Sequence, residues 1–134
     1  LRSTIEVNYQ NEEISNFTLT ENFSYNNQSN KFEMSQYKKN VENNLLNKIA
    51  ENLILNLTEK LYLLQRYDEA ISYCENAIDK NTKSKFIYNN LCACYNQKGE
   101  WLKAKSACEK ALILDPDFQL AKNNLNWALG GLNK

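Results

Sequence analysis

The chain of 134 residues carries 16 Lys and Arg residues against 16 Asp and Glu residues, so its formal net charge is zero. A chain without net charge produces no field that would gather nucleic-acid phosphates or anionic lipid, so we expect no nucleic-acid partner. No stretch approaches the roughly 18 apolar residues that a membrane-spanning helix needs, so we expect no membrane insertion by this segment.

The first thirty residues are rich in Asn, Ser and Thr and show no helical pattern. Apolar and polar side chains alternate at Ile5, Val7 and Tyr9, which favours extended chain over helix. Two shorter alternations follow, at Phe17 and Leu19 and at Phe23 and Tyr25. We predict an extended or disordered lead-in over residues 1–31.

A helical domain is predicted over residues 32–134. From Phe32 to Leu64 no Gly or Pro interrupts the chain, and apolar residues recur every four positions at Tyr37, Val41, Leu45, Ile49 and Leu53. This spacing keeps one apolar face along a helix, so it predicts either one long helix or two helices joined by a kink.

The rest of the sequence repeats with a period of 34 residues. Residues 51–84 align with residues 85–118 without a gap, so that Leu57 meets Leu91 and Ile78 meets Leu112. Such a period is typical of helical hairpins, which stack because one hairpin cannot bury its apolar face alone. We predict two hairpins, followed by a capping helix over residues 118–130.

Turn and cap signals mark the helix ends. The residues that we assign to turns and caps between helices are Gln65, Arg66, Asn81, Ser84 and Gly99. Asn and Gly tolerate left-handed backbone, and Ser is a favoured N-cap. Pro116 ends the second hairpin because it has no N–H to donate. We expect Asp117 to cap the last helix, and Gly130 and Gly131 to end it.

Four cysteines lie in the predicted hairpins: Cys74, Cys92, Cys94 and Cys108. Cys92 and Cys94 are separated by a rotation of about 200° on a helix, so their thiols point apart and a metal chelate is not expected. Cys74 and Cys108 occupy equivalent repeat positions, where Cys commonly acts as a small buried hydrophobe. We predict reduced packing thiols, with a disulfide between neighbouring helices as the alternative that Cα separations would decide.

Catalytic chemistry has little support in the sequence. There is no His, which removes the commonest general base and the commonest zinc ligand. No Gly-rich phosphate loop is present, and no Ser or Cys has a His to activate it. We therefore expect this segment not to be an enzyme and to carry no cofactor and no metal.

Small, aromatic and turn residues recur at fixed positions of the repeat. They are Tyr67, Ala70, Ala77, Tyr95, Gly99, Trp101, Ala104, Ala111 and Pro116. In this arrangement residues 51–130 resemble the tetratricopeptide repeat family, whose small residues let two helices approach closely. The resemblance implies an all-α fold of antiparallel hairpins stacked in a right-handed superhelix. Thr58 and Cys92 depart from the family pattern, since Gly or Ala is usual there.

Asparagines mark the groove that the resemblance implies. Asn56, Asn90 and Asn124 are spaced by 34 residues, and Asn89 and Asn123 lie beside the last two. An amide offers a donor and an acceptor together, which suits the main chain of an extended peptide. The arrangement is similar to the asparagine ladder of the repeat domains of O-linked sugar transferases and kinesin light chains. It implies a protein–protein interaction module that binds a peptide segment, although Asn is so abundant here that mere solvation of the groove explains the pattern equally well.

The carboxylate clamp of co-chaperones is a weaker alternative within the same family. It needs Lys and Asn at positions that are here Leu55 and Glu59, and Lys and Arg at positions that are here Leu120 and Asn124, and only Asn90 matches. A carboxylate ligand would meet no positive charge, and Glu59 would repel it.

A structural or self-association role is the second alternative, in which the long helix and the lead-in fill the groove or pair two copies as a homodimer. The passage from Asn89 to Ala128 resembles repeat segments appended to bacterial membrane proteins, including sugar transferases. This likeness implies an extracytoplasmic location for a domain of a larger, membrane-attached protein, with a cytoplasmic location as the alternative.

Overall fold

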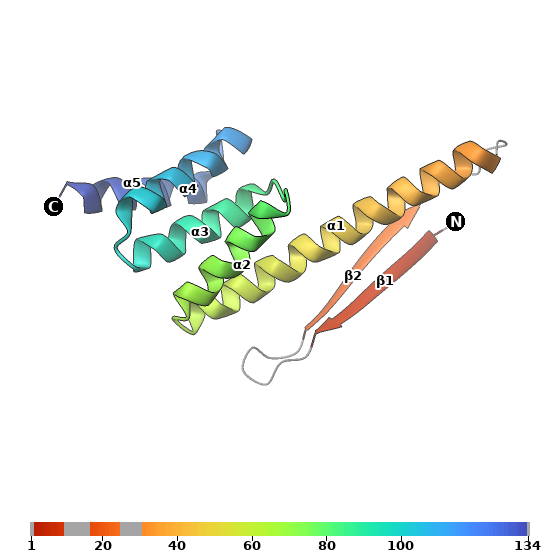
Figure 1. The fold of residues 1–134 in the computed structure, drawn as a ribbon, viewed down its shortest axis with the longest axis horizontal. Coiled ribbons are helices and arrows are strands. Elements are labelled where there is room, and N and C mark those ends of the chain that lie inside the picture. Colours follow the sequence, from red (N-terminus) through yellow and green to blue (C-terminus); the bar gives the residue numbers. More distant parts are fainter. Residues whose placement is uncertain (1, 10–16, 25–30, 134) are drawn as a thin grey trace. The chain divides into compact units, whose positions relative to one another are not determined.

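The computed structural model describes residues 2–9, 17–24 and 31–133 (Figure 1). The chain divides into two compact units, Leu1–Leu53 and Ile54–Lys134. The division falls inside a helix, whereas the sequence placed the domain boundary between residues 31 and 32.

The first unit contains two antiparallel strands, β1 (Arg2–Tyr9) and β2 (Phe17–Ser24). Their register pairs Arg2 with Ser24 at one end and Tyr9 with Phe17 at the other. The alternating segments of the predicted lead-in thus contain extended chain, while its residues 1, 10–16 and 25–30 lie outside the described residues.

Helix α1 (Lys31–Leu63) follows as one uninterrupted element of 33 residues. Of the two arrangements that the sequence left open, a single long helix is the one observed. No Gly or Pro occurs within it to break the backbone hydrogen bonds. Leu45 and Ile49 are buried in its first part, and Leu57 and Leu61 in its last.

The second unit is an array of helices that begins with the end of α1. It continues with α2 (Tyr67–Asp79), α3 (Lys85–Gln97), α4 (Trp101–Leu114) and α5 (Gln119–Leu132). Helix α3 contacts α2, α4 and α5 (Figure 1). The repeated alanines Ala70, Ala77, Ala104 and Ala111 are buried within this array. The prediction of an all-α fold of stacked hairpins is confirmed for this unit.

The turns between these helices use left-handed backbone. Gln65 has φ 60°, Asn81 φ 69° and Gly99 φ 72°. The side-chain oxygen of Ser84 accepts a hydrogen bond from the N–H of Ile87 at 3.4 Å and so caps α3. Asn81 and Gly99 are residue types that tolerate or supply this backbone, whereas Gln65 adopts it without such a preference.

The last helix differs from the prediction at both ends. Its N-cap is Phe118 rather than Asp117, because Asp117 donates its backbone N–H to the Asp115 carboxylate at 3.0 Å instead of capping with its side chain. The helix also runs through Gly130 and Gly131 to Leu132. A Cβ atom on Gly131 would lie 2.3 Å from Cδ2 of Trp101. Gly131 therefore lets the indole ring lie against the helix and does not end it.

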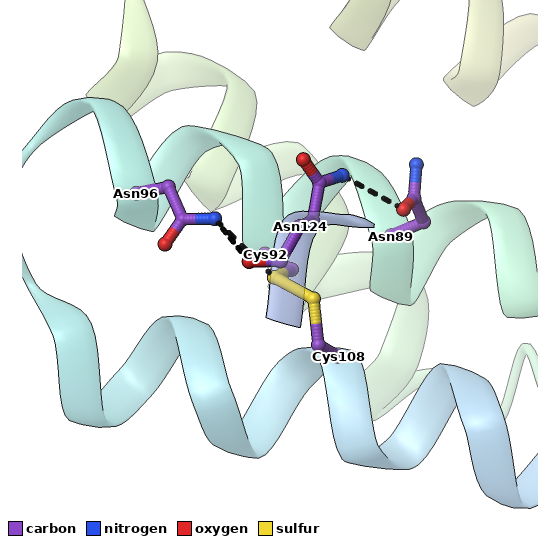
Figure 2. The surroundings of a disulfide bond; sticks show 5 residues. All are labelled: Asn89, Cys92, Asn96, Cys108 and Asn124. Atoms are coloured by element: carbon purple, nitrogen blue, oxygen red, sulfur yellow. Dashed lines mark hydrogen bonds between the residues drawn. A yellow bond between two sulfur atoms is a disulfide. The ribbon is translucent and has the colours of Figure 1, made fainter. Parts of the chain in front are cut away.

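The prediction of reduced cysteines is wrong for one pair. Cys92 and Cys108 form a disulfide between α3 and α4, with their Cα atoms 5.4 Å apart (Figure 2). Tight packing of these two helices brings the Cα atoms within the range that a disulfide spans. Cys74 and Cys94 are free and buried, and burial raises the pKa of their thiols to about 12 and about 11.

Within the ranges that the structure describes, no helix combines the length and the apolar character needed to cross a bilayer.

Candidate peptide-binding groove

A groove of about 470 Å³ lies on the second unit. Its walls come from α1, α3 and α5. The lining residues are Leu55, Glu59, Tyr62, Phe86, Asn90, Ala93, Leu120 and Asn124. Two of the five predicted groove asparagines, Asn90 and Asn124, are therefore brought together in one hollow.

Asn90 is held in place by the end of α1. Its side-chain Nδ2 donates to Oγ1 of Thr58 at 3.0 Å, and that hydroxyl donates to the carbonyl of Leu55 at 3.1 Å. Thr58 is almost fully buried, so the bond is shielded from water. This chain fixes the Asn90 amide at the groove wall and joins α3 to α1.

Asn124 is held in the same manner by α3. Its Nδ2 donates to Oδ1 of Asn89 at 2.9 Å (Figure 2). Its backbone carbonyl accepts a hydrogen bond from Nδ2 of Asn96, also at 2.9 Å. Each groove asparagine thus bonds back to the preceding helix of the groove, so the amides join the hairpins as well as lining the hollow.

These internal bonds use part of what each amide offers. An Asn side chain has two N–H donors and a carbonyl oxygen with two acceptor sites. Asn90 and Asn124 each spend one donor, and among the described residues none donates to the Oδ1 of either side chain. Both side chains are partly exposed. One N–H and the carbonyl oxygen of each amide are therefore available to a ligand.

The other three predicted asparagines lie elsewhere. Asn56 is half-buried and is not among the lining residues, because α1 lines the groove with Leu55 and Asn56 follows about 100° around the helix. Asn89 is buried and supports Asn124. Asn123 is exposed and accepts a hydrogen bond from Gln119 at 2.9 Å. The groove therefore contains two of the ladder asparagines.

Aromatic residues shape the groove walls. The Tyr62 hydroxyl accepts a hydrogen bond from Gln97 at 2.6 Å, which joins α1 to α3. The ring of Phe86 meets the ring of Phe118 edge to face at 5.3 Å, and the Lys85 ammonium lies 5.1 Å from the centre of the Phe86 ring. These contacts restrict where the two rings can lie.

The groove carries little charge. Glu59 is the single charged lining residue, and its side chain is exposed. Among the described residues no Lys or Arg forms an ion pair with it, and no lining residue is basic. The described part of the chain also holds no cluster of three metal-ligating side chains. The chemistry of this surface is that of amides, apolar walls and one carboxylate.

The aromatic repeat positions pack at the helix junctions. Tyr67 meets Tyr62 edge to face with ring centres 5.5 Å apart, and Trp101 packs against Gly131. Tyr95 is buried and donates its hydroxyl proton to Glu75, and burial raises its pKa. Pro116 is exposed directly after α4, and Gly99 precedes Trp101 in the turn.

A second hollow, of about 350 Å³, is lined by α2, α3 and α4. Its walls carry two carboxylates, Glu75 and Asp79, and two lysines, Lys103 and Lys110. The lysines lie over the rings of Tyr95 and Tyr88, at 5.3 and 5.8 Å from their centres. Its acidic and basic groups are balanced, so it favours neither sign of ligand.

Sequence reasoning missed Asn96 and did not give Thr58 a role. Asn96 is almost fully buried, and its bond to the Asn124 carbonyl joins α3 to α5. No periodic signal marks it, because the equivalent residue one repeat earlier is Tyr62. Thr58 did carry a signal, since it stands where the family has Gly or Ala.

Comparison with known proteins identifies the repeat. Residues 86–118 match the family of the tetratricopeptide repeat. Hsp70-Hsp90 organizing protein of Triticum aestivum is 36% identical over 59 residues, which cover 44% of this chain and 10% of that protein. Anaphase-promoting complex subunit 6 of Arabidopsis thaliana is 39% identical over 79 residues, or 59% of this chain and 14% of that protein.

Sperm-associated antigen 1 of Mus musculus is 35% identical over 68 residues, or 51% of this chain and 8% of that protein. The chain thus spans about a tenth of the length of these relatives. Repeats of this family are typically non-catalytic modules of protein–protein interaction. Residues 86–118 are therefore a tetratricopeptide repeat.

Proposed function

We propose that the groove binds an extended segment of another protein, with Asn90 and Asn124 gripping its main chain. The observation that carries this proposal is that two amides, one repeat apart, line the same hollow with their carbonyl oxygens unengaged. An extended peptide presents alternating N–H and C=O groups, which an amide can bind as acceptor and as donor.

The apolar walls would take the side chains of such a segment. Leu55, Phe86 and Leu120 lie around the two amides, and Phe86 and Leu120 are exposed. Side chains of an extended chain point alternately to opposite faces, so every second residue can enter the groove. Recognition would rest on main-chain bonds and a few apolar contacts, without a catalytic step, cofactor or metal.

This proposal keeps the asparagine ladder in a reduced form. Asn90 and Asn124 are the gripping residues, and Asn89 orients Asn124 from behind. Asn56 and Asn123 are not assigned a contact with the ligand.

The experiment is a selection of displayed random peptides on the immobilised chain, followed by fluorescence anisotropy with the peptides obtained. Replacing Asn90→Ala together with Asn124→Ala should weaken binding by about 1 to 3 kcal/mol. Equal binding by this double variant would exclude the amide grip.

A matched control is needed because both asparagines also join helices. Thr58→Val keeps the shape of Thr58 but removes the oxygen that accepts from Asn90. It should lower the free energy of unfolding by about 1 kcal/mol and weaken peptide binding by less than the double variant does, because the Asn90 amide is retained and loses only its support. A loss of affinity equal to that of the double variant would mean that the amides act through packing alone.

Self-association is a second candidate, and the exposed apolar residues of α4 favour it. Leu102 and Ile113 are 72% and 80% exposed. Light scattering tests this role: a tight dimer that no longer binds groove peptides would favour assembly. A monomer that binds them would favour partner binding.

For the compartment, we propose an oxidising environment such as the extracytoplasmic side of a membrane. The Cys92–Cys108 bond supports it, because disulfides persist where glutathione and thioredoxin do not keep thiols reduced. Cells expressing the full-length protein would be lysed with an alkylating reagent, and tryptic peptides would be analysed by mass spectrometry. Alkylated Cys92 and Cys108 would contradict the proposal.

A further inference from the structure

The position of Glu59 indicates the charge of the peptide segment that would bind in the groove. Glu59 lies on the groove wall formed by α1, together with Leu55 and Tyr62. The lining contains no Lys or Arg, and within the described residues no cation pairs with this carboxylate. All the other lining side chains are apolar, aromatic or amide. A ligand in the groove therefore meets one sign of charge, at one place.

The consequence for a ligand follows from electrostatics. A segment with an acidic side chain beside Glu59 would be repelled by a like charge. A neutral segment would cover the carboxylate partly and remove some of its water without supplying a partner, which costs free energy. A Lys or Arg side chain would supply both the charge and the hydrogen bonds.

We infer that the natural occupant is an internal, basic segment of a partner protein, in which a Lys or Arg reaches Glu59 and apolar residues stand two positions away on either side. This inference rests on the proposed function of the groove. The spacing follows from the pleat of an extended chain, in which residues two apart point to the same face. A free C-terminal carboxylate or an acidic tail has no cation to receive it here.

The experiment uses the displayed random peptides on three forms of the chain: wild type, Glu59→Gln and Glu59→Lys. Wild type should enrich peptides with Lys or Arg between apolar residues. Glu59→Gln should lose the basic preference and keep the apolar one, and Glu59→Lys should turn the preference towards Asp and Glu. Glu109→Gln is the matched control, since Glu109 is exposed on α4 and outside the groove lining.

Affinities then measure the size of the effect. For a selected peptide, replacing its Lys by Gln should weaken binding to wild type about two- to fivefold, as expected for an exposed ion pair. The same replacement should have no effect on binding to Glu59→Gln.

The outcomes separate the two levels of the proposal. Selected peptides that depend on Asn90 and Asn124 but show no basic preference would overturn this inference and leave the groove function standing. Selected peptides whose binding ignores the Asn90→Ala and Asn124→Ala double variant would overturn both.

Discussion

In the second hairpin, Cys92 of α3 is bonded to Cys108 of α4, whereas the equivalent positions of the first hairpin are Thr58 of α1 and Cys74 of α2. The first hairpin thus has a hydroxyl where the second has a sulfur. That hydroxyl accepts a hydrogen bond from the side-chain amide of Asn90. The same repeat position therefore forms a disulfide in one hairpin and supports a groove residue in the other.

The turns within the two hairpins also differ in the residue that takes the left-handed backbone. Gly99 supplies the left-handed backbone in the second hairpin, while Gln65 adopts it in the first. The family match covers residues 86–118 alone. The family match therefore falls on the second hairpin, although both hairpins depart from the family pattern at the equivalent positions Thr58 and Cys92.

Removing the cross-link should have the largest effect. Cys92→Ala with Cys108→Ala should lower the free energy of unfolding by about 3 kcal/mol, because the bond closes a loop with a sequence separation of 16. Urea denaturation without reductant measures it. Cys74→Ala is the control, since it removes the equivalent sulfur without breaking a bond and should cost only about 1 kcal/mol. Equal losses would contradict the difference between the hairpins.

Adding an equivalent disulfide to the first hairpin should have the next largest effect. Thr58→Cys places a thiol opposite Cys74, at the positions that are bonded in the second hairpin. Free thiols counted in denaturant without reductant should fall from the two present now, Cys74 and Cys94, to Cys94 alone. The added bond should stabilise the chain by about 2 kcal/mol. A count of three free thiols would show that the two hairpins do not pack alike.

The two neighbouring glycines of α5 should respond with opposite signs. Gly131→Ala should destabilise the chain by about 1 to 2 kcal/mol, because its Cβ would overlap the Trp101 ring. Gly130→Ala should stabilise it by about 0.5 to 1 kcal/mol, because nothing lies within 4 Å of the added Cβ. Thermal unfolding of both variants measures this, and matching shifts would mean that Trp101 does not need the close approach.

Acidic solution should slightly lower the stability of both hairpins. The pKa of Asp115 is lowered by its hydrogen bond from Lys85, and that of Glu100 by hydrogen bonds from Lys103 and Lys98. In the first hairpin Arg66 lowers the pKa of Glu69. A lowered pKa contributes stability that is present above the ordinary value of about 4 and is lost as pH falls through the lower folded value.

The melting temperature should therefore be flat between about pH 5 and 8, since the chain has no His, and should fall in more acidic solution. Circular dichroism across this range measures it. A transition near pH 6.5 would contradict this assignment of the titrating groups.

Local signals predicted much of the helical fold. Asn81, Gly99 and Ser84 carry turn and cap chemistry in their own residue types, and the structure places them in those roles. The 34-residue period predicted that the hairpins stack. The disulfide could not be predicted, because it depends on the distance between Cα atoms of two neighbouring helices.

The groove was harder to predict for a related reason. A period of 34 residues makes Asn56, Asn90 and Asn124 equivalent, but it does not say which side of α1 faces the hollow. A shift of one residue around a helix was enough to place Leu55 in the lining and Asn56 outside it. The presence of Gly131 inside α5, and not after its end, depends likewise on the Trp101 ring, which lies in another helix.

The most direct test of the groove is a nuclear magnetic resonance titration of the chain with a selected peptide, following its backbone amides and the side-chain amides of its asparagines. We predict shifts at Asn90 and Asn124, with smaller ones at Asn89, and none around Tyr88 and Lys110 of the second hollow. Shifts confined to that second hollow, with Asn90 and Asn124 unchanged, would contradict the central claim that these two amides receive the ligand.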